Sequence, residues 1–96
     1  MTLDEFRTTL SDKEPPQSAS LLVAALWHDA RDDWNRAHQI AQDIENEDAA
    51  WVHAYLHRKE GDLGNAAYWY RRARRPVCDI PLESEWTEIV ASLLAR

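Results

Sequence analysis

Three polar residues at helical spacing form the strongest candidate for chemistry in this sequence. His53 and His57 are four residues apart, and Glu60 lies about one further turn along the same face of a predicted helix. Such a row could relay protons or hold a zinc ion, with water or His38 as a further ligand. The zinc-protease signature is excluded because it needs Glu directly after the first His, where Ala54 stands. The row therefore supplies the candidate catalytic or metal residues of a small metal-dependent or acid-base enzyme.

A structural role for the histidines is the alternative. His57 has a counterpart in His28, which occupies the same position of an internal repeat described below. Buried imidazoles are usually hydrogen-bonded to neighbouring side chains, and such groups often serve only the fold. The sequence alone requires neither a metal nor another cofactor.

Another face of the same predicted helix combines aromatic area with two cations: Trp51, Tyr55, Arg58 and Lys59. This combination could bind a protein segment that is acidic, or a small anionic ligand, because arginine binds a carboxylate bidentately. His53, His57 and His38 would complete the ligand-binding set. The alternative is that the rings belong to the core and the cations are solvated. A groove needs Trp51 and Arg58 exposed together, whereas an enzyme needs its histidines in a concave pocket.

Charge and composition argue against several other classes of function. Residues 68–75 mix aromatic rings with four arginines, as single-stranded nucleic acid would need, but the net charge of −6 argues against nucleic acid and anionic membranes. The arginines could instead complement the end of their helix and the acids Glu83, Glu85 and Glu88. With only two glycines and no glycine-serine elbow, neither an acyl-transfer triad nor a phosphate-binding loop is recognisable.

At 96 residues the chain should form one domain with a small core. Five tryptophans predict either a tryptophan-rich core or a tryptophan-lined groove. The single Cys78 allows no intrachain disulfide, and the acidic N-terminus does not resemble a secretion signal. The longest apolar run, residues 21–27, is too short to span a bilayer. We therefore expect a cytoplasmic, soluble protein.

A series of predicted helices places these candidate residues relative to one another. A short leading helix over residues 3–12 ends before Pro15 and Pro16, which divides a lead segment, residues 1–16, from the domain proper, residues 17–96. Five further helices follow. Their boundaries are marked by cap and turn residues, namely Asp32 or Asp33, Asn46 or Glu47, Gly61, Asp62, Pro76 and Pro81. No segment alternates with period two, so an all-helical fold is favoured.

An internal repeat of 29 residues supports this organisation. It aligns Ala25 with Ala54, His28 with His57, Asp33 with Asp62, and Ala37 with Ala66. The repeat predicts two matched helical hairpins.

The second hairpin resembles the tetratricopeptide repeat. The segment Gly61-Asp62-Leu63-Gly64-Asn65-Ala66, followed by Tyr70, Ala73 and Pro76, is similar to the turn and second helix of that family. In the first hairpin, Asp32 stands where the family has glycine. The resemblance covers roughly residues 21–76, with a repeat shorter than the family's usual length. Residues 53–72 also resemble a small uncharacterised bacterial family.

The resemblance implies an all-α, right-handed stack of antiparallel helical hairpins with a C-terminal capping helix. It also implies a non-enzymatic interaction module whose first helices form a groove. Two hairpins are fewer than the usual minimum of about three repeats, so an apolar face would be left open. We therefore hypothesise a homodimer in which a second copy of the chain covers this face.

Overall fold

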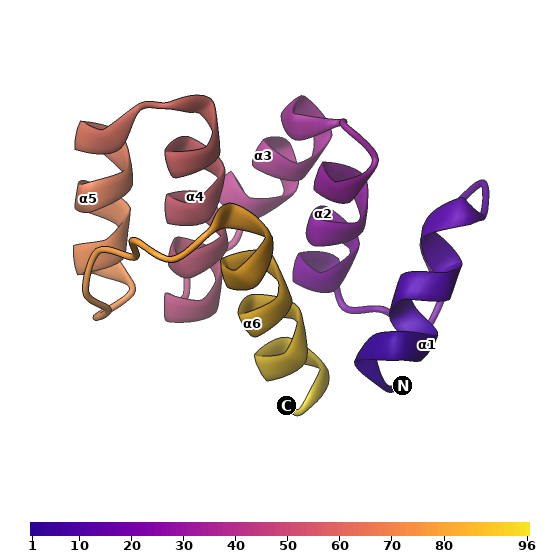
Figure 1. Ribbon diagram of the computed structural model, residues 1–96. Coiled ribbons are helices and arrows are strands. Elements are labelled where there is room, and N and C mark those ends of the chain that lie inside the picture. The colour runs from indigo at the N-terminus through magenta and orange to yellow at the C-terminus, as the bar shows by residue number, and fades with distance from the viewer.

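The protein contains helices and no strands, which confirms the all-α prediction (Figure 1). The computed structural model describes all residues, 1–96. The helices are α1 (Leu3–Thr8), the short 3-10 helix η1 (Thr9–Ser11), α2 (Leu21–Ala30), α3 (Trp34–Gln42), α4 (Glu47–Glu60), α5 (Leu63–Arg72) and α6 (Leu82–Leu94). None of these helices is both long enough and apolar enough to cross a membrane.

Predicted cap residues begin three of the helices, α3, α4 and α5. The side chain of Asp33 accepts a hydrogen bond from the Arg36 amide at the start of α3, and Asp62 accepts one from the Asn65 amide in α5. Asn46 caps α4 in the same way. Each cap satisfies a backbone amide that has no partner inside its own helix.

The two hairpin turns share one backbone pattern, in agreement with the internal repeat. Asp32 has a φ of 63° and Gly61 a φ of 90°, so both lie in the left-handed region. One residue later, the amides of Asp33 and Asp62 each donate a hydrogen bond of 2.9 Å to the carbonyl of a histidine five residues earlier, His28 or His57. This bond closes the C-terminal turn of a helix and reverses the chain. Glycine adopts such a φ freely, whereas aspartate does so at some cost.

Helix α4 is the centre of the molecule, and α3, α5 and α6 pack against it (Figure 1). Every residue from Ala49 to His57 is buried, so this helix has no solvent-facing side over more than two turns. A helix buried on all sides must place its polar side chains against partners from neighbouring helices. The functional residues predicted from the sequence lie almost entirely on this helix.

The tryptophans mainly build the core. Trp27, Trp51 and Trp86 are buried, while Trp34 and Trp69 are partly buried against the core. Four of the five indoles donate hydrogen bonds, to Thr9 O from Trp27, Leu56 O from Trp34, Glu85 Oε2 from Trp51 and Leu26 O from Trp86. Buried indoles need such partners, so these bonds also fix the relative positions of the helices.

The lead segment packs onto the rest of the chain. Phe6 of α1 is fully buried and stacks on Trp86 with a centroid distance of 6.1 Å. Arg31, directly after α2, donates hydrogen bonds to the carbonyls of Leu10 and Asp12. Residues 1–16 therefore share the core of the helices that follow.

Candidate functional site

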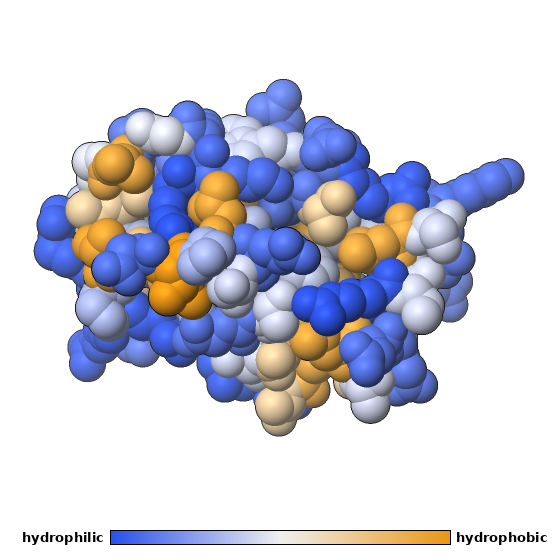
Figure 2. Space-filling model, in the orientation of Figure 1, coloured by the Kyte–Doolittle hydropathy of each residue, from blue (hydrophilic) through white to orange (hydrophobic).

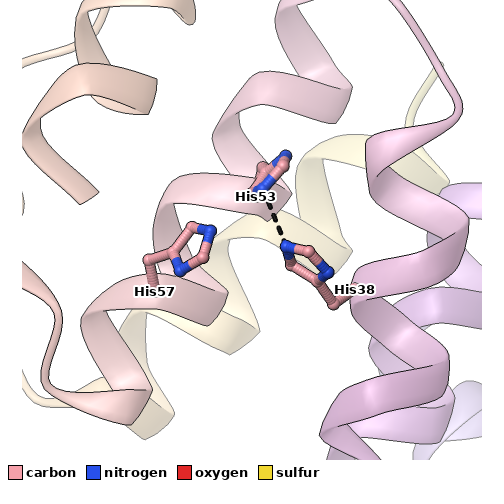
Figure 3. A group of neighbouring side chains, drawn as sticks. All are labelled: His38, His53 and His57. Atoms are coloured by element: carbon pink, nitrogen blue, oxygen red, sulfur yellow. Dashed lines mark hydrogen bonds between the residues drawn. The ribbon is translucent and has the colours of Figure 1, made fainter. Parts of the chain in front are cut away.

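Three histidines from two helices meet at the junction of α3 and α4 (Figure 3). His38 Nε2 lies 3.0 Å from His53 Nε2, and one ring nitrogen from each of His38, His53 and His57 lies within 4.8 Å of the others. His53 and His57 are buried, with exposed fractions of 5% and 7%, and His38 is half-buried. We call His38, His53 and His57 the histidine cluster.

Two tryptophans hold the rings of the histidine cluster in place. Trp34 stacks on His38 with a centroid distance of 4.8 Å, and Trp69 stacks on His53 at 3.9 Å. Both pairs are nearly parallel, with interplanar angles of 10° and 12°. These contacts restrict rotation of the imidazoles, so the ring nitrogens are oriented before any ligand arrives.

Polar residues of α4 and α5 contact the outer side of His57. Glu60 Oε1 lies 3.3 Å from His57 Nδ1, and Asn65 Nδ2 lies 3.3 Å from His57 Nε2. A proton on Nδ1 satisfies both contacts, because His57 then donates to the carboxylate and accepts from the amide. A carboxylate bound to one ring nitrogen is the usual outer partner of a metal-ligating histidine.

Burial suppresses the positive charge of two members of the cluster. Desolvation, together with repulsion from His38 and His57, lowers the pKa of His53 to about 4. Desolvation, followed by repulsion from His57, also lowers the pKa of His38. Both rings are therefore neutral at pH 7, and in their mutual hydrogen bond one Nε2 donates while the other accepts. Neutral imidazole is the form that binds metal ions.

The spacing of the histidine nitrogens suits a transition-metal ion. Zinc binds imidazole at about 2.0–2.1 Å with tetrahedral geometry, which places ligand nitrogens about 3.3 Å apart. The 3.0 Å separation of His38 and His53 is close to this value, and His57 is within reach once its Nε2 gives up the contact with Asn65. Three protein ligands would leave one coordination position open. A cavity of about 490 Å³ is lined by His53, Trp69 and Arg72, so it approaches one member of the cluster.

The composition of the cluster differs from the row predicted by helical spacing. Glu60 contacts His57 but is not grouped with His53, and His38 of α3 takes that place instead. A second group, His57, Glu60 and Asp62, lies at the exposed end of α4. Helical spacing finds neighbours on one helix, whereas the contact between His38 and His53 depends on how α3 packs against α4.

The four residues of the predicted groove are instead bound to two buried carboxylates. Glu85 accepts hydrogen bonds from Trp51 and Arg58, and Asp29 accepts them from Tyr55 and Lys59. Trp51 and Tyr55 are buried, with exposed fractions of 3% and 2%. A groove required Trp51 and Arg58 to be exposed together, and the structure does not meet this condition because Glu85 holds both from inside.

Glu85 is the more heavily bonded of the two carboxylates. It is 1% exposed, and its oxygens also lie 2.8 and 2.7 Å from the hydroxyl of Tyr70. Arg58 donates to Glu85 Oε1 at 2.9 Å and to the carbonyl of Ile80. Burial, together with the hydrogen bond to Glu85, raises the pKa of Tyr70, so this hydroxyl remains a donor. The sequence suggested that Glu85 faced the arginines after Tyr68, but its ion-pair partner is Arg58.

The arginines after Tyr68 lie mainly against aromatic rings. Arg72 lies 5.2 Å from the centroid of Trp69, and Arg75 lies over the ring of Trp51 at 3.3 Å. Arg74 is the one that forms an ion pair, with Glu47 at 3.3 Å. Both members of that pair are well exposed, so it contributes little to stability.

Comparisons with known proteins find no match for this chain among protein-family models, curated proteins or solved structures.

Proposed function

We propose that the protein is a non-enzymatic binding module whose ligand is a divalent transition-metal ion held by His38, His53 and His57. The convergence of three imidazoles from two helices carries this proposal, since their ring nitrogens lie within 4.8 Å of one another. Imidazole suits Zn²⁺, Cu²⁺ and Ni²⁺ better than Mg²⁺ or Ca²⁺. Binding to this site would join α3 to α4.

The surroundings of the cluster support binding more than acid-base catalysis. A general base works best when its pKa is near the operating pH, and the pKa of about 4 makes His53 a weak base at pH 7. The same lowered pKa favours metal binding, because a neutral imidazole loses no net proton when it ligates. The ring that donates through Nε2 would move that proton to its Nδ1. Glu60 would act as the outer carboxylate of His57.

The proposal includes the arrangement of the helices. We place the chain in a right-handed stack of two antiparallel hairpins, α2–α3 and α4–α5, with α6 as the capping helix, as in tetratricopeptide repeats. The matched hydrogen bonds of the two hairpin turns support this arrangement. The histidine cluster would then lie at the junction of the hairpins. A homodimer through the open face of the stack stays a prediction, to be checked by light scattering.

Metal titration of protein purified without a histidine tag tests the proposal. We expect one Co²⁺ or Zn²⁺ per chain, measured by visible absorption for Co²⁺ and by calorimetry for Zn²⁺. The variants His38→Ala and His53→Ala should each lose more than about 100-fold in affinity, beyond the range caused by outer-sphere changes. Circular dichroism establishes whether each variant is folded at the temperature of the titration.

His28→Ala is the matched control. His28 occupies the repeat position equivalent to His57, is half-buried, and lies outside the histidine cluster. Its removal should leave the metal affinity unchanged. Weak, non-stoichiometric binding by the wild type, or equal binding by wild type and folded His38→Ala, would contradict the proposed function.

A further inference from the structure

A second cavity, of about 440 Å³, lies where α1, η1, α2, α4 and α6 meet. Its volume falls in the lower part of the range of about 300–1,000 Å³ for small-molecule sites. Leu10, Leu82 and Trp86 provide apolar walls. On the face of the molecule seen in Figure 2, apolar patches lie on both sides of hydrophilic side chains between the α6 and α1 regions. The cavity belongs neither to the histidine cluster nor to the route that leads to it.

At the inner end of this cavity, the carboxylate of Asp29 is already bound within the protein. Asp29 is 1% exposed, and both of its oxygens are bound, Oδ1 by Lys59 at 3.0 Å and Oδ2 by the Tyr55 hydroxyl at 3.2 Å. The Lys59 ammonium has three N–H groups and uses one of them for Asp29. Its side chain is 34% exposed, so the remaining donors are accessible from the cavity.

Arg7 contributes a second cation to the lining. Its Nη2 donates to Thr87 Oγ1 at 2.8 Å, and no carboxylate lies within ion-pair distance of it. Glu83, which is exposed, is the only acid of the lining whose oxygens are not already bound within the protein. The lining thus holds two cations and two acids, but Asp29 is already bound by Lys59 and Tyr55, whereas Arg7 has no acid partner. The unpaired Arg7 and the unused donors of Lys59 favour an anionic group over a cationic one.

We infer that this cavity binds a small monocarboxylic acid with an apolar body. The carboxylate is received by Arg7 and Lys59, and the apolar body lies against Leu10, Leu82 and Trp86. Both the carboxylate and the apolar body of such a ligand contribute to binding. The carboxylate compensates Arg7, which has no ion-pair partner, and accepts from the donors that Lys59 does not use for Asp29. The apolar body displaces water from walls that cannot hydrogen-bond to it.

Hexanoate, hexylamine and hexan-1-ol are suitable probes because they share one apolar chain and differ in charge. Binding is followed by the NMR signal of the indole N–H of Trp86, a residue that lines the cavity and donates to Leu26 O at 3.0 Å. We expect saturable shifts with hexanoate and at least about tenfold weaker binding of the other two probes, as loss of a charge-assisted hydrogen bond implies.

Two exposed residues of the lining provide variants with opposite expected effects. Arg7→Gln should weaken hexanoate binding by about tenfold, and Glu83→Gln should strengthen it by about twofold to threefold. Neither change removes a partner of buried Asp29, and equal unfolding midpoints would confirm that the fold is retained. Absence of a saturable hexanoate shift, equal binding of hexylamine, or equal hexanoate affinity in wild type and Arg7→Gln would overturn the inference.

Discussion

Helix α4 takes part in two buried polar groups that differ in how their charges are satisfied. In the first, the carboxylate network, Asp29 and Glu85 bind four residues of α4: Trp51, Tyr55, Arg58 and Lys59. In the second, the histidine cluster, nitrogen faces nitrogen across 3.0 Å. The carboxylate network pairs opposite charges, whereas the histidine cluster holds similar groups together. A saturated network stabilises one arrangement of helices, whereas converging imidazoles could exchange their mutual contacts for bonds to an ion.

Removing a carboxylate should produce the largest effect on stability. In Glu85→Ala, Arg58 loses its ion-pair partner and Tyr70 loses its acceptor inside the protein. We expect the free energy of unfolding to fall by about 3–5 kcal/mol, the cost of breaking a buried ion pair from one side. Urea denaturation measures this change. The neighbouring exposed residue provides the control, since Glu88→Ala should change stability by less than about 0.5 kcal/mol. Similar values for both variants would mean that the network does not determine the fold.

Acidification should weaken the fold through the histidine cluster. The pKa of His53 is about 4 in the folded protein, compared with about 6.5 in the unfolded chain, so the unfolded state binds more protons between these values. The free energy of unfolding should be unaffected by His53 above pH 6.5 and fall as the pH drops toward 4, by about 3 kcal/mol in total. Urea denaturation at a series of pH values measures the slope.

The variant His53→Gln isolates this contribution. It keeps a polar side chain at the site but cannot be protonated in this range, so its stability should decline less between pH 6.5 and 4. Parallel curves for wild type and variant would show that the charge of His53 does not limit stability. The histidine cluster and the carboxylate network would then not differ in this respect, because both would tolerate charge.

A smaller, stabilising change lies outside both polar groups. Asp32 has a φ of 63° at the repeat position where the second hairpin has Gly61. Asp32→Gly should raise the free energy of unfolding by about 0.5–1 kcal/mol, because glycine adopts this conformation without steric cost. Thermal unfolding detects such a change. Metal affinity should stay at the wild-type value, and a loss of it would show that the histidine cluster depends on overall stability rather than on its own ligands.

Much of the local structure was predictable because it depends on short-range chemistry. Asp33, Asn46 and Asp62 cap the helices that their positions indicated, and Gly61 ends α4. The turn at Asp32 was also marked, through its alignment with Gly61. Helix ends are decided by hydrogen bonds within a few residues, and such bonds leave a signal in the sequence.

The candidate site was only partly predictable. His53 and His57 were placed together by helical spacing, but His38 entered as an auxiliary ligand, and Trp34 and Trp69 were not recognised as neighbours of the rings. The residue types of the groove, such as Trp51 and Arg58, suit either binding or burial. Their partner Glu85 is 27 residues from Arg58, so no local pattern could indicate the ion pair.

The sequence by itself determined the helical class, the hairpin turns and the alignment of polar residues on the faces of α4, because periodicity and capping act over a few residues. Only the tertiary structure decided which face became a saturated network and which became a cluster of imidazoles. That choice depends on what α2, α3 and α6 bring against α4. Buried Asp29 and Glu85 satisfied one face, and His38 met the other with a group of the same kind.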